Sequence, residues 1–521
     1  MMNKISLTLD GNSLNLEVLW QWAHAESGEI KISAQARKRI LKSREYVDQI
    51  TRGDTAVYGI NTGFGLLSDH KIPRDQLEQL QLNLIRSHSV GVGNALPIPE
   101  ARAAMLLRTN TLVKGYSGAS GELIDQLVKI QNAGIVPWIP EQGSVGACGD
   151  LAPLAHMALV LIGEGKCYYQ GKILPSAKAL SLAKLQPYRL RAKEGLALIN
   201  GTQIMTAIGS LVLYDSLRLA KIADFAAAMS LDAFRGTTKA FDPAIHSVRA
   251  HSEQALVAKN ITDLVKKSKI MHSHKDCGKV QDPYSFRCIP QVHGAARRLL
   301  NNAVCVLETE MNSATDNPLV FLPEDLQGKG EGPDGGEIMS GGNFHGEYIA
   351  MMMDTVAIAL SEFANISDLR VQKLINPTVS GLPAFLTKDP GLNSGMMIVQ
   401  VASASLVSEN KILSHPASVD SIPTSADKED HVSMGTTAAR KARQILNNLR
   451  NVLAMELLCG YQAIALLRPL KSSPAIEAAW GKIRERVPEI KGDRIFHDDI
   501  NAIHELLVSG ELLATLPSTL N

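Results

Sequence analysis

A long amphipathic segment in the last quarter of the chain most constrains the fold. Between residues 440 and 467, apolar residues recur at the period of an α-helix, and arginine and asparagine occupy the other face. The apolar positions are Ile445, Leu446, Leu449, Val452, Leu453 and Leu457. Long helices joined by compact loops favour a helical bundle over a doubly wound parallel sheet.

Similar patterns predict further helices, and few segments predict strands. The other expected helices cover residues 99–133, 203–232, 290–314, 343–375 and 396–414. Ser6–Leu9 alternates between polar and apolar residues, and Cys167–Ile173 is typical of a short hairpin that turns at Gln170-Gly171. The sequence therefore predicts a mainly α fold.

The charge balance gives no indication of a polyanionic partner. The 521 residues are 45% hydrophobic and 20% charged, with a formal net charge of +1. This balance favours neither nucleic acid nor a membrane surface. The N-terminal residues lack the apolar core of a signal peptide, and the stretch 151–163 is too short to span a bilayer. We expect a cytoplasmic protein without a membrane partner.

The cysteines and histidines do not predict a metal site. The six cysteines are Cys148, Cys167, Cys277, Cys288, Cys305 and Cys459, and they form no CxxC pair. His272 and His274 lack a third ligand at suitable spacing, so we interpret them as a loop pair. His156 lies on an apolar stretch and is expected to be packed rather than catalytic.

A glycine-rich segment interrupts the helical pattern at residues 328–343. A phosphate-binding loop is one interpretation, but the Walker spacing is absent and no strand clearly precedes the segment. We expect instead a flexible surface excursion that leads into a helix.

The residues Ala147-Cys148-Gly149 predict a backbone that reacts with itself. The glycine amide nitrogen is unhindered enough to attack the carbonyl two residues back, and glycine allows the necessary dihedral angles. Loss of the β-substituent of the middle residue would leave an exocyclic methylidene, which is an electrophile. Two alternatives remain: a turn before a helix that starts near Asp150, and a nucleophile elbow. The elbow is disfavoured because it requires glycine where Asp150 stands.

The surrounding segment, Gly143 to His156, resembles the core motif of the histidine/phenylalanine/tyrosine ammonia-lyase family. Members of this family build 4-methylidene-imidazole-5-one (MIO) from Ala-Ser-Gly, and Cys148 stands where they have serine. Loss of hydrogen sulfide from cysteine gives the same alkene as loss of water from serine. The resemblance implies MIO formation without a diffusible cofactor. An uncyclised, inactive homologue is the alternative.

Four further segments resemble the family and imply roles for their residues. They are Tyr58–Gly65, Leu198–Thr202, Gln281–Cys288 and Gly341–Gly346, and the stretch Pro416–Ser421 supports them. The resemblance implies that Tyr58 is the base, which requires a phenol pKa depressed below its usual value of about 10. It implies that Arg287 binds the substrate carboxylate, that Gln281 and Tyr284 lie near the MIO, that Asn200 steadies the MIO or the substrate, and that Phe344 lines the pocket. Taken singly, each segment also fits a turn, a helix start or a structural tyrosine.

Two segments bear on the substrate. Ser87-His88 resembles the selectivity loop of the histidine-specific members, although some tyrosine enzymes share it. Glu429 lies in a Lys-Glu-Asp-His-Val-Ser-Met segment, where its carboxylate would pair with an imidazole N–H. Helix-start electrostatics is the alternative for this segment. Lys428 departs from the usual glutamine of the family and would weaken the proton-accepting role of Glu429.

The resemblance implies an aspartase/fumarase-like long-helix bundle. It places a loop-rich MIO-bearing region at residues 1–200 and a C-terminal helical bundle at residues 201–521. It also implies a homotetramer whose active sites combine several subunits. The predicted reaction is non-oxidative elimination of ammonia from an aromatic L-amino acid, with histidine favoured. Tyrosine, phenylalanine and an aminomutase reaction remain alternatives.

Overall fold

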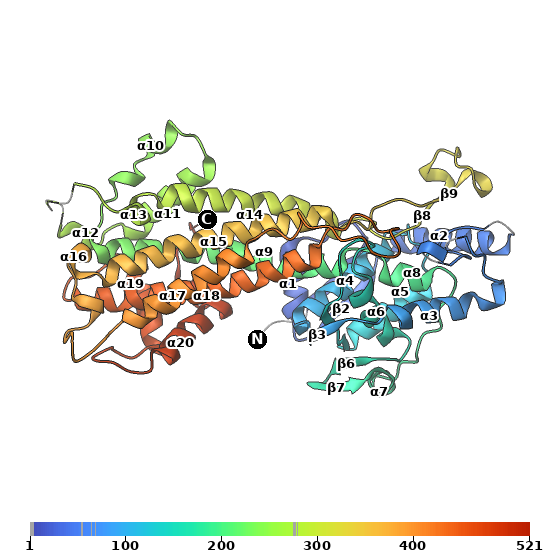
Figure 1. The fold of residues 1–521 in the computed structure, drawn as a ribbon, viewed down its shortest axis with the longest axis horizontal. Coiled ribbons are helices and arrows are strands. Elements are labelled where there is room, and N and C mark those ends of the chain that lie inside the picture. The colour runs from blue at the N-terminus through green and yellow to red at the C-terminus, as the bar shows by residue number, and fades with distance from the viewer. Residues whose placement is uncertain are drawn as a thin grey trace. The chain divides into compact units, whose positions relative to one another are not determined.

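Helices make up most of the chain, as the sequence predicts (Figure 1). The structure is a computed structural model that describes residues 5–53, 56–63, 65–67, 69–274, 278 and 280–520. Its residues form two compact units. The first unit contains residues 1–214, 304–354 and 416–440, and the second contains residues 215–303, 355–415 and 441–521.

The first unit contains eight complete helices and nine short strands among its described residues. The helices are α1 (Leu16–His24), α2 (Ala34–Arg52), α3 (Leu77–His88), α4 (Ile98–Val113), α5 (Gly121–Asn132), α6 (Leu151–Leu161), α7 (Ser176–Leu182) and α8 (Glu194–Ile199). The strands are β1 (Ile5–Leu9), β2 (Gly28–Ile32), β3 (Val92–Ala95), β4 (Val136–Pro137), β5 (Pro140–Gln142), β6 (Lys166–Tyr169), β7 (Lys172–Pro175), β8 (Leu319–Phe321) and β9 (Glu337–Met339). They form small sheets: parallel β1-β2, and antiparallel β3-β5, β4-β6-β7 and β8-β9.

The long helices and the second unit complete the fold. Four helices contribute residues to both units: α9 (Gln203–Phe234), α14 (Ile289–Met311), α15 (Glu347–Ile375) and α18 (Gly435–Leu466). The second unit adds α10 (Pro243–Ser247), α11 (Ser252–Val265), α12 (Lys269–His272), α13 (Tyr284–Arg287), α16 (Pro377–Ser380), α17 (Met397–Leu413), α19 (Pro474–Arg486) and α20 (Phe496–Ser509). Within this unit, α14, α15, α17 and α18 run alongside one another (Figure 1).

Most predicted elements are confirmed, and one is wrong. The segments predicted at 203–232, 290–314, 343–375, 396–414 and 440–467 correspond to α9, α14, α15, α17 and α18, and β6 and β7 form the predicted hairpin. The segment 99–133 is two helices rather than one. The backbone at Gly115 and Gly118 is left-handed, which ends α4 and separates it from α5.

The unit boundaries differ from a single division after residue 200. Residues 304–354 and 416–440 join the first unit because their segments pack on its N-terminal part. In one cluster, Val320 and Leu322 near β8 pack against Tyr46 and Val47 of α2 and against Ile60. This cluster anchors the loop that carries Tyr58.

The glycine-rich segment 328–343 begins with a closed loop and contains β9 (Glu337–Met339) in its second half. Gly330 N–H donates to Gly335 O, and Gly332 N–H donates to Gly336 O. The predicted excursion is therefore present between β8 and β9, and its flexibility stays a prediction.

Helix α15 is long and apolar enough to cross a membrane by length and composition. However, 67% of its apolar window is buried inside the protein, as expected for a core helix. Arg370 of this helix forms a buried ion pair with Glu456 of α18, with an Nε–Oε1 distance of 2.6 Å. Also buried in the second unit, His293 Nδ1 lies 2.7 Å from Asp224 Oδ1.

Candidate active site

The backbone of Ala147-Cys148-Gly149 is clamped against the end of α8. Gly201 N–H donates to Cys148 O at 3.3 Å, and Asp150 N–H donates to Gly201 O at 2.8 Å. Gly149 has a φ of +68°, and a Cβ added there would lie 2.0 Å from Gly201 O. Only glycine fits this position, because any larger residue would clash with backbone.

Asn200 holds the same peptide from its side chain. Asn200 Nδ2 donates to Cys148 O at 3.3 Å, while Asn200 Oδ1 is buried and accepts no hydrogen bond from the described residues. The buried Arg108 fixes this end of α8, since its guanidinium donates to Ala197 O and Asn200 O, both at 2.9 Å. Asn200 thus contacts the Ala-Cys-Gly segment, and its role in steadying the MIO or the substrate stays a prediction. The sequence analysis did not identify Arg108.

The Asp150 side chain accepts hydrogen bonds from three separate segments of the chain, next to the reactive peptide. Its fully buried carboxylate accepts from Ile204 N at 3.0 Å, Met205 N at 2.9 Å and Ser144 Oγ at 2.8 Å. Thr436 Oγ1 is a fourth donor. Burial raises the pKa of Asp150 and outweighs these hydrogen bonds. The sequence indicated only a residue at a helix start, because Thr436 is remote in the chain.

A cavity of about 730 Å³ opens beside this peptide, within the first unit. The predicted residues that line it are Tyr58, Ala147, Cys148, Asn200, Phe344 and Glu429. Its other lining residues include Thr62, Asn317, His345, Lys428 and His431. The structure therefore brings together six of the predicted site residues from five separate parts of the chain.

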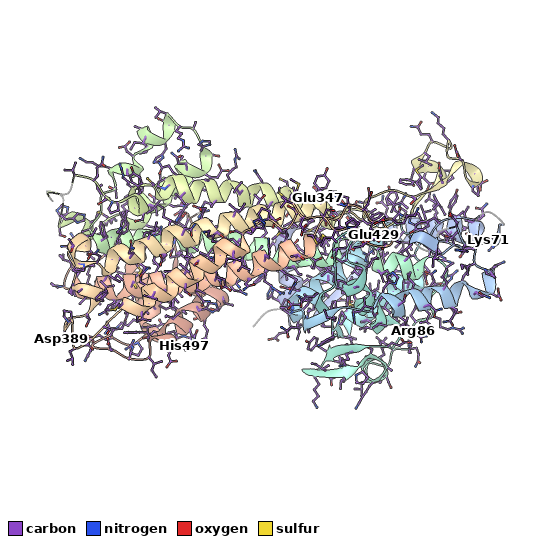
Figure 2. All side chains as sticks on the ribbon, in the orientation of Figure 1. Lys71, Arg86, Glu347, Asp389, Glu429 and His497 are labelled. Atoms are coloured by element: carbon purple, nitrogen blue, oxygen red, sulfur yellow. The ribbon has the colours of Figure 1, made fainter. Side chains whose placement is uncertain are left out.

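Glu429 lies directly against Cys148. Cys148 Sγ donates to Glu429 Oε1 at 3.1 Å, and Thr424 Oγ1 donates to Glu429 Oε2 at 2.8 Å. Burial, and then the neighbouring Glu429, raise the pKa of the Cys148 thiol, so this cysteine is held as a thiol rather than a thiolate. Because α18 begins only at Gly435, Glu429 is not in the first turn of a helix. Figure 2 labels Glu429 in the first unit.

The environment of Tyr58 differs from the expectation for a base. Burial raises the pKa of Tyr58, a hydrogen bond with the Gly65 backbone lowers it, and Cys148 and Glu429 raise it further. The net shift is upward, whereas the sequence-based hypothesis requires a depressed pKa. That role would require positive charge, a helix dipole or further hydrogen bonds to the phenolate. Phe64 of the same motif lies outside the described residues.

His88 ends α3 and is not among the residues that line the cavity. Burial lowers its pKa, although a hydrogen bond to Leu84 O at 2.8 Å opposes this. Because a backbone carbonyl only accepts, His88 Nδ1 carries the proton in this contact, and the lowered pKa favours the neutral ring.

Three predicted residues belong to the second unit. Tyr284 is 70% exposed at the start of α13, and the Arg287 guanidinium lies 4.6 Å from the centre of its ring. Arg287 Nε is buried and has no hydrogen-bond partner among the described residues. Gln281 lines a separate cavity of about 850 Å³ in that unit. Their part in the site stays a prediction.

The other cysteines and histidines that the sequence analysis singled out form no cluster among the described residues. Cys167, Cys288, Cys305 and Cys459 are free thiols, and Cys277 lies outside the described residues. Both ring nitrogens of His274 contact backbone carbonyls, at 2.8 and 2.9 Å, so they are engaged in the loop. His156 Nε2 accepts from Gly91 N at 3.1 Å.

Comparison with known proteins identifies the family. A family model described as aromatic amino acid lyase matches residues 14–485. A histidine ammonia-lyase from Myxococcus xanthus is 51% identical over 99% of both chains. The crystal structure of histidine ammonia-lyase from Trypanosoma cruzi is 44% identical, with a TM-score of 0.90 over 99% of this chain and 96% of that one. A tyrosine aminomutase from Streptomyces globisporus is 38% identical, with a TM-score of 0.90 over 98% of both chains.

These likenesses extend over nearly the whole chain, and they agree with the clustering of Tyr58, Cys148, Asn200 and Glu429 around one cavity. Hence the resemblance that the sequence indicated and the mainly α fold that it predicted are both confirmed. The chain is a member of the aromatic amino acid lyase family.

Proposed function

We propose that the protein is an ammonia-lyase that converts L-histidine to urocanate without oxidation. The observation that carries this proposal is the contact of Glu429 with Cys148 inside the cavity, because a carboxylate beside the reactive residue can accept from the N–H of a substrate imidazole. The phenylalanine ring has no such N–H, and the tyrosine ring carries an O–H instead. The similarity to proteins named histidine ammonia-lyase supports the same substrate.

The electrophile forms from the chain itself in this proposal. The Gly149 nitrogen attacks the Ala147 carbonyl carbon and forms a C–N bond. The carbonyl oxygen leaves as water with the protons of the Gly149 and Cys148 amides, so a C=N bond remains between Ala147 C and Cys148 N. The Cys148 Cα–H proton and the Cys148 SH group then leave as hydrogen sulfide, which forms the exocyclic methylidene. The two hydrogen bonds between this segment and Gly201 use the N–H groups of Gly201 and Asp150, so neither engages the Gly149 nitrogen. Asn200 Nδ2 donates to Cys148 O at 3.3 Å, and this oxygen would become the carbonyl oxygen of the product ring.

The MIO group supplies an electrophilic carbon that activates the amino acid for loss of ammonia. The chain's own residues bind and orient the substrate. Glu429 accepts the imidazole N–H, Phe344 forms a wall of the cavity, and Tyr58 removes the β-proton.

Other residues come from the second unit of a neighbouring subunit in this proposal. Arg287 holds the substrate carboxylate with its forked guanidinium, and Gln281 and Tyr284 lie near the MIO. This sharing requires an oligomer, and the family resemblance implies a homotetramer. It would also bring the positive charge of Arg287 to the site of Tyr58, whose pKa is raised within one chain.

Intact-mass analysis tests the electrophile first. A deficit equal to one water plus one hydrogen sulfide supports the proposal. An unmodified chain with a titratable Cys148 supports the alternative of an uncyclised, inactive homologue.

Turnover of L-histidine, L-tyrosine and L-phenylalanine, measured side by side, tests the reaction. Urocanate formation should be fastest, and Tyr58→Phe should abolish it while leaving the mass deficit intact. Faster formation of coumarate or cinnamate would contradict the substrate assignment. A β-amino acid product would favour an aminomutase, which the similarity to tyrosine aminomutase makes the second candidate.

Subunit mixing tests the shared site. Tyr58→Phe and Arg287→Ala subunits, each inactive alone, should recover part of the activity after exchange. No recovery despite verified exchange, or a monomer by light scattering, would contradict the shared site.

A further inference from the structure

Two histidines and a glutamate form a cluster that the proposed reaction does not use. His345 follows Phe344, His431 follows Glu429 by two residues, and Glu347 is the first residue of α15. One ligand atom from each of these three side chains lies within 4.8 Å of the other two. His345 and His431 line the cavity that contains Cys148, and Figure 2 labels Glu347 and Glu429.

The spacing of the two histidines matches that of metal ligands. His345 Nε2 and His431 Nδ1 are 3.4 Å apart, and the ring planes are tilted by 31°. In a tetrahedral zinc site with Zn–N bonds of about 2.0–2.1 Å, two nitrogen ligands lie roughly 3.3 Å apart. The pair therefore needs almost no movement to hold one ion.

The glutamate adds an independent indication. Glu347 Oε2 is buried, and no described residue donates a hydrogen bond to it. A buried carboxylate oxygen without a donor is costly, and a bound cation would offset that cost. A ligand set of two imidazoles and one carboxylate suits zinc and leaves a fourth position open.

We propose that His345, Glu347 and His431 bind a divalent transition-metal ion of the Zn²⁺ type in the wall of the cavity. The ion joins the segment before α15 to the segment that carries Glu429. This site is separate from the electrophile and does not depend on the proposed reaction. The competing explanation is that the two histidines only stabilise the cavity wall, through the hydrogen bond that His345 Nε2 donates to His431 O at 3.3 Å.

The test is a Zn²⁺ titration of the full-length, tag-free protein against a chromophoric chelator, after prior removal of metal. The wild type should bind one ion per chain. His345→Gln, His431→Gln and Glu347→Gln should each weaken binding at least about tenfold, because each removes one ligand. Glu347→Gln preserves the shape of the side chain and removes the buried charge. The metal-free variant should therefore melt no lower than the metal-free wild type, while its Zn²⁺ binding is weakened.

His497→Gln is the matched control. His497 is exposed in the second unit and contacts Asn501 at 2.7 Å, far along the chain from the cluster (Figure 2). Its replacement should leave Zn²⁺ binding unchanged. Co²⁺ bound in place of Zn²⁺ should show a visible spectrum that changes in both histidine variants. Absence of stoichiometric binding, or equal binding by all four variants, would overturn the proposal, since surface thiols or histidines would then explain the uptake.

Discussion

Two buried carboxylates, one in each unit, are stabilised in opposite ways. Asp150 in the first unit accepts hydrogen bonds from two backbone N–H groups and two hydroxyls, and burial raises its pKa. Asp224 in the second unit faces Arg297 and His293, both at 2.7 Å. Although burial raises the pKa of Asp224, Arg297 and His293 hold it below its usual value.

The difference reflects what each unit must do. In the first unit, polar groups hold a short, irregular peptide in one conformation, as chemistry on that peptide requires. In the second unit, buried ion pairs join regular helices: Arg370 of α15 contacts Glu456 of α18 at 2.6 and 2.8 Å. Changes in the first unit should therefore affect maturation, and changes in the second should affect stability.

The largest effect is expected for Gly149→Ala. The added Cβ would lie 2.0 Å from Gly201 O at a φ of +68°, so the peptide cannot keep its conformation. We expect no mass deficit and no measurable turnover. Gly171→Ala is the matched control, because Gly171 has a similar φ of +74° but open space around it. Normal maturation in the Gly149→Ala variant would show that the clamp is unnecessary.

Glu456→Ala should have the largest effect in the second unit. It leaves the fully buried Arg370 without its carboxylate partner, which costs about 3–5 kcal/mol of unfolding free energy. The midpoint of urea denaturation should fall, while the folded fraction keeps its mass deficit. A double replacement, Arg370→Met with Glu456→Met, should cost less than Glu456→Ala. If the single variant instead lost its mass deficit while still folded, the division of roles between the units would be wrong.

Lowering the pH should have a smaller effect on the free energy of unfolding. Burial lowers the pKa of His293, and Arg370 and Arg297 lower it further against the opposing effect of Asp224. The folded pKa lies below the unfolded value of 6.5, so the unfolded state binds more protons as the pH falls and stability is lost. We expect a loss of up to about 1.4 kcal/mol per pH unit below pH 6.5 from this residue. The protonation of Asp224 acts in the same direction at lower pH.

His293→Gln should flatten this dependence of the denaturation midpoint between pH 7 and pH 5. An equally steep profile in the variant would assign the acid sensitivity to other groups.

The sequence analysis predicted those helices that depend on local patterns of apolar residues. The stripe at Ile445, Leu449 and Leu453 predicted α18, because period and length are local properties. The break between α4 and α5 was missed because the apolar pattern continues on both sides of Gly115 and Gly118.

For the site, family motifs identified residues but not their surroundings. Tyr58, Cys148, Asn200 and Glu429 line one cavity, as the resemblance implied that they would act together. The four donors to Asp150 come from segments far apart in the chain, and the raised pKa of Tyr58 depends on burial and on Cys148 and Glu429. Neither can be derived before the chain is folded, since each depends on contacts between distant residues.

The smallest effect is expected for Lys428→Gln. Lys428 lines the cavity beside Glu429 but is exposed, and exposed charge pairs contribute only about 0.2–1 kcal/mol. Removal of the cation leaves Glu429 a better acceptor for the imidazole N–H. The KM for L-histidine should therefore fall, by less than about fivefold, with little change in kcat. Lys71→Gln, an exposed residue of the first unit (Figure 2), controls for net charge. A rise in the KM of Lys428→Gln, or a fall of more than about tenfold, would place the ammonium in direct contact with the substrate, because only a close and desolvated charge acts so strongly.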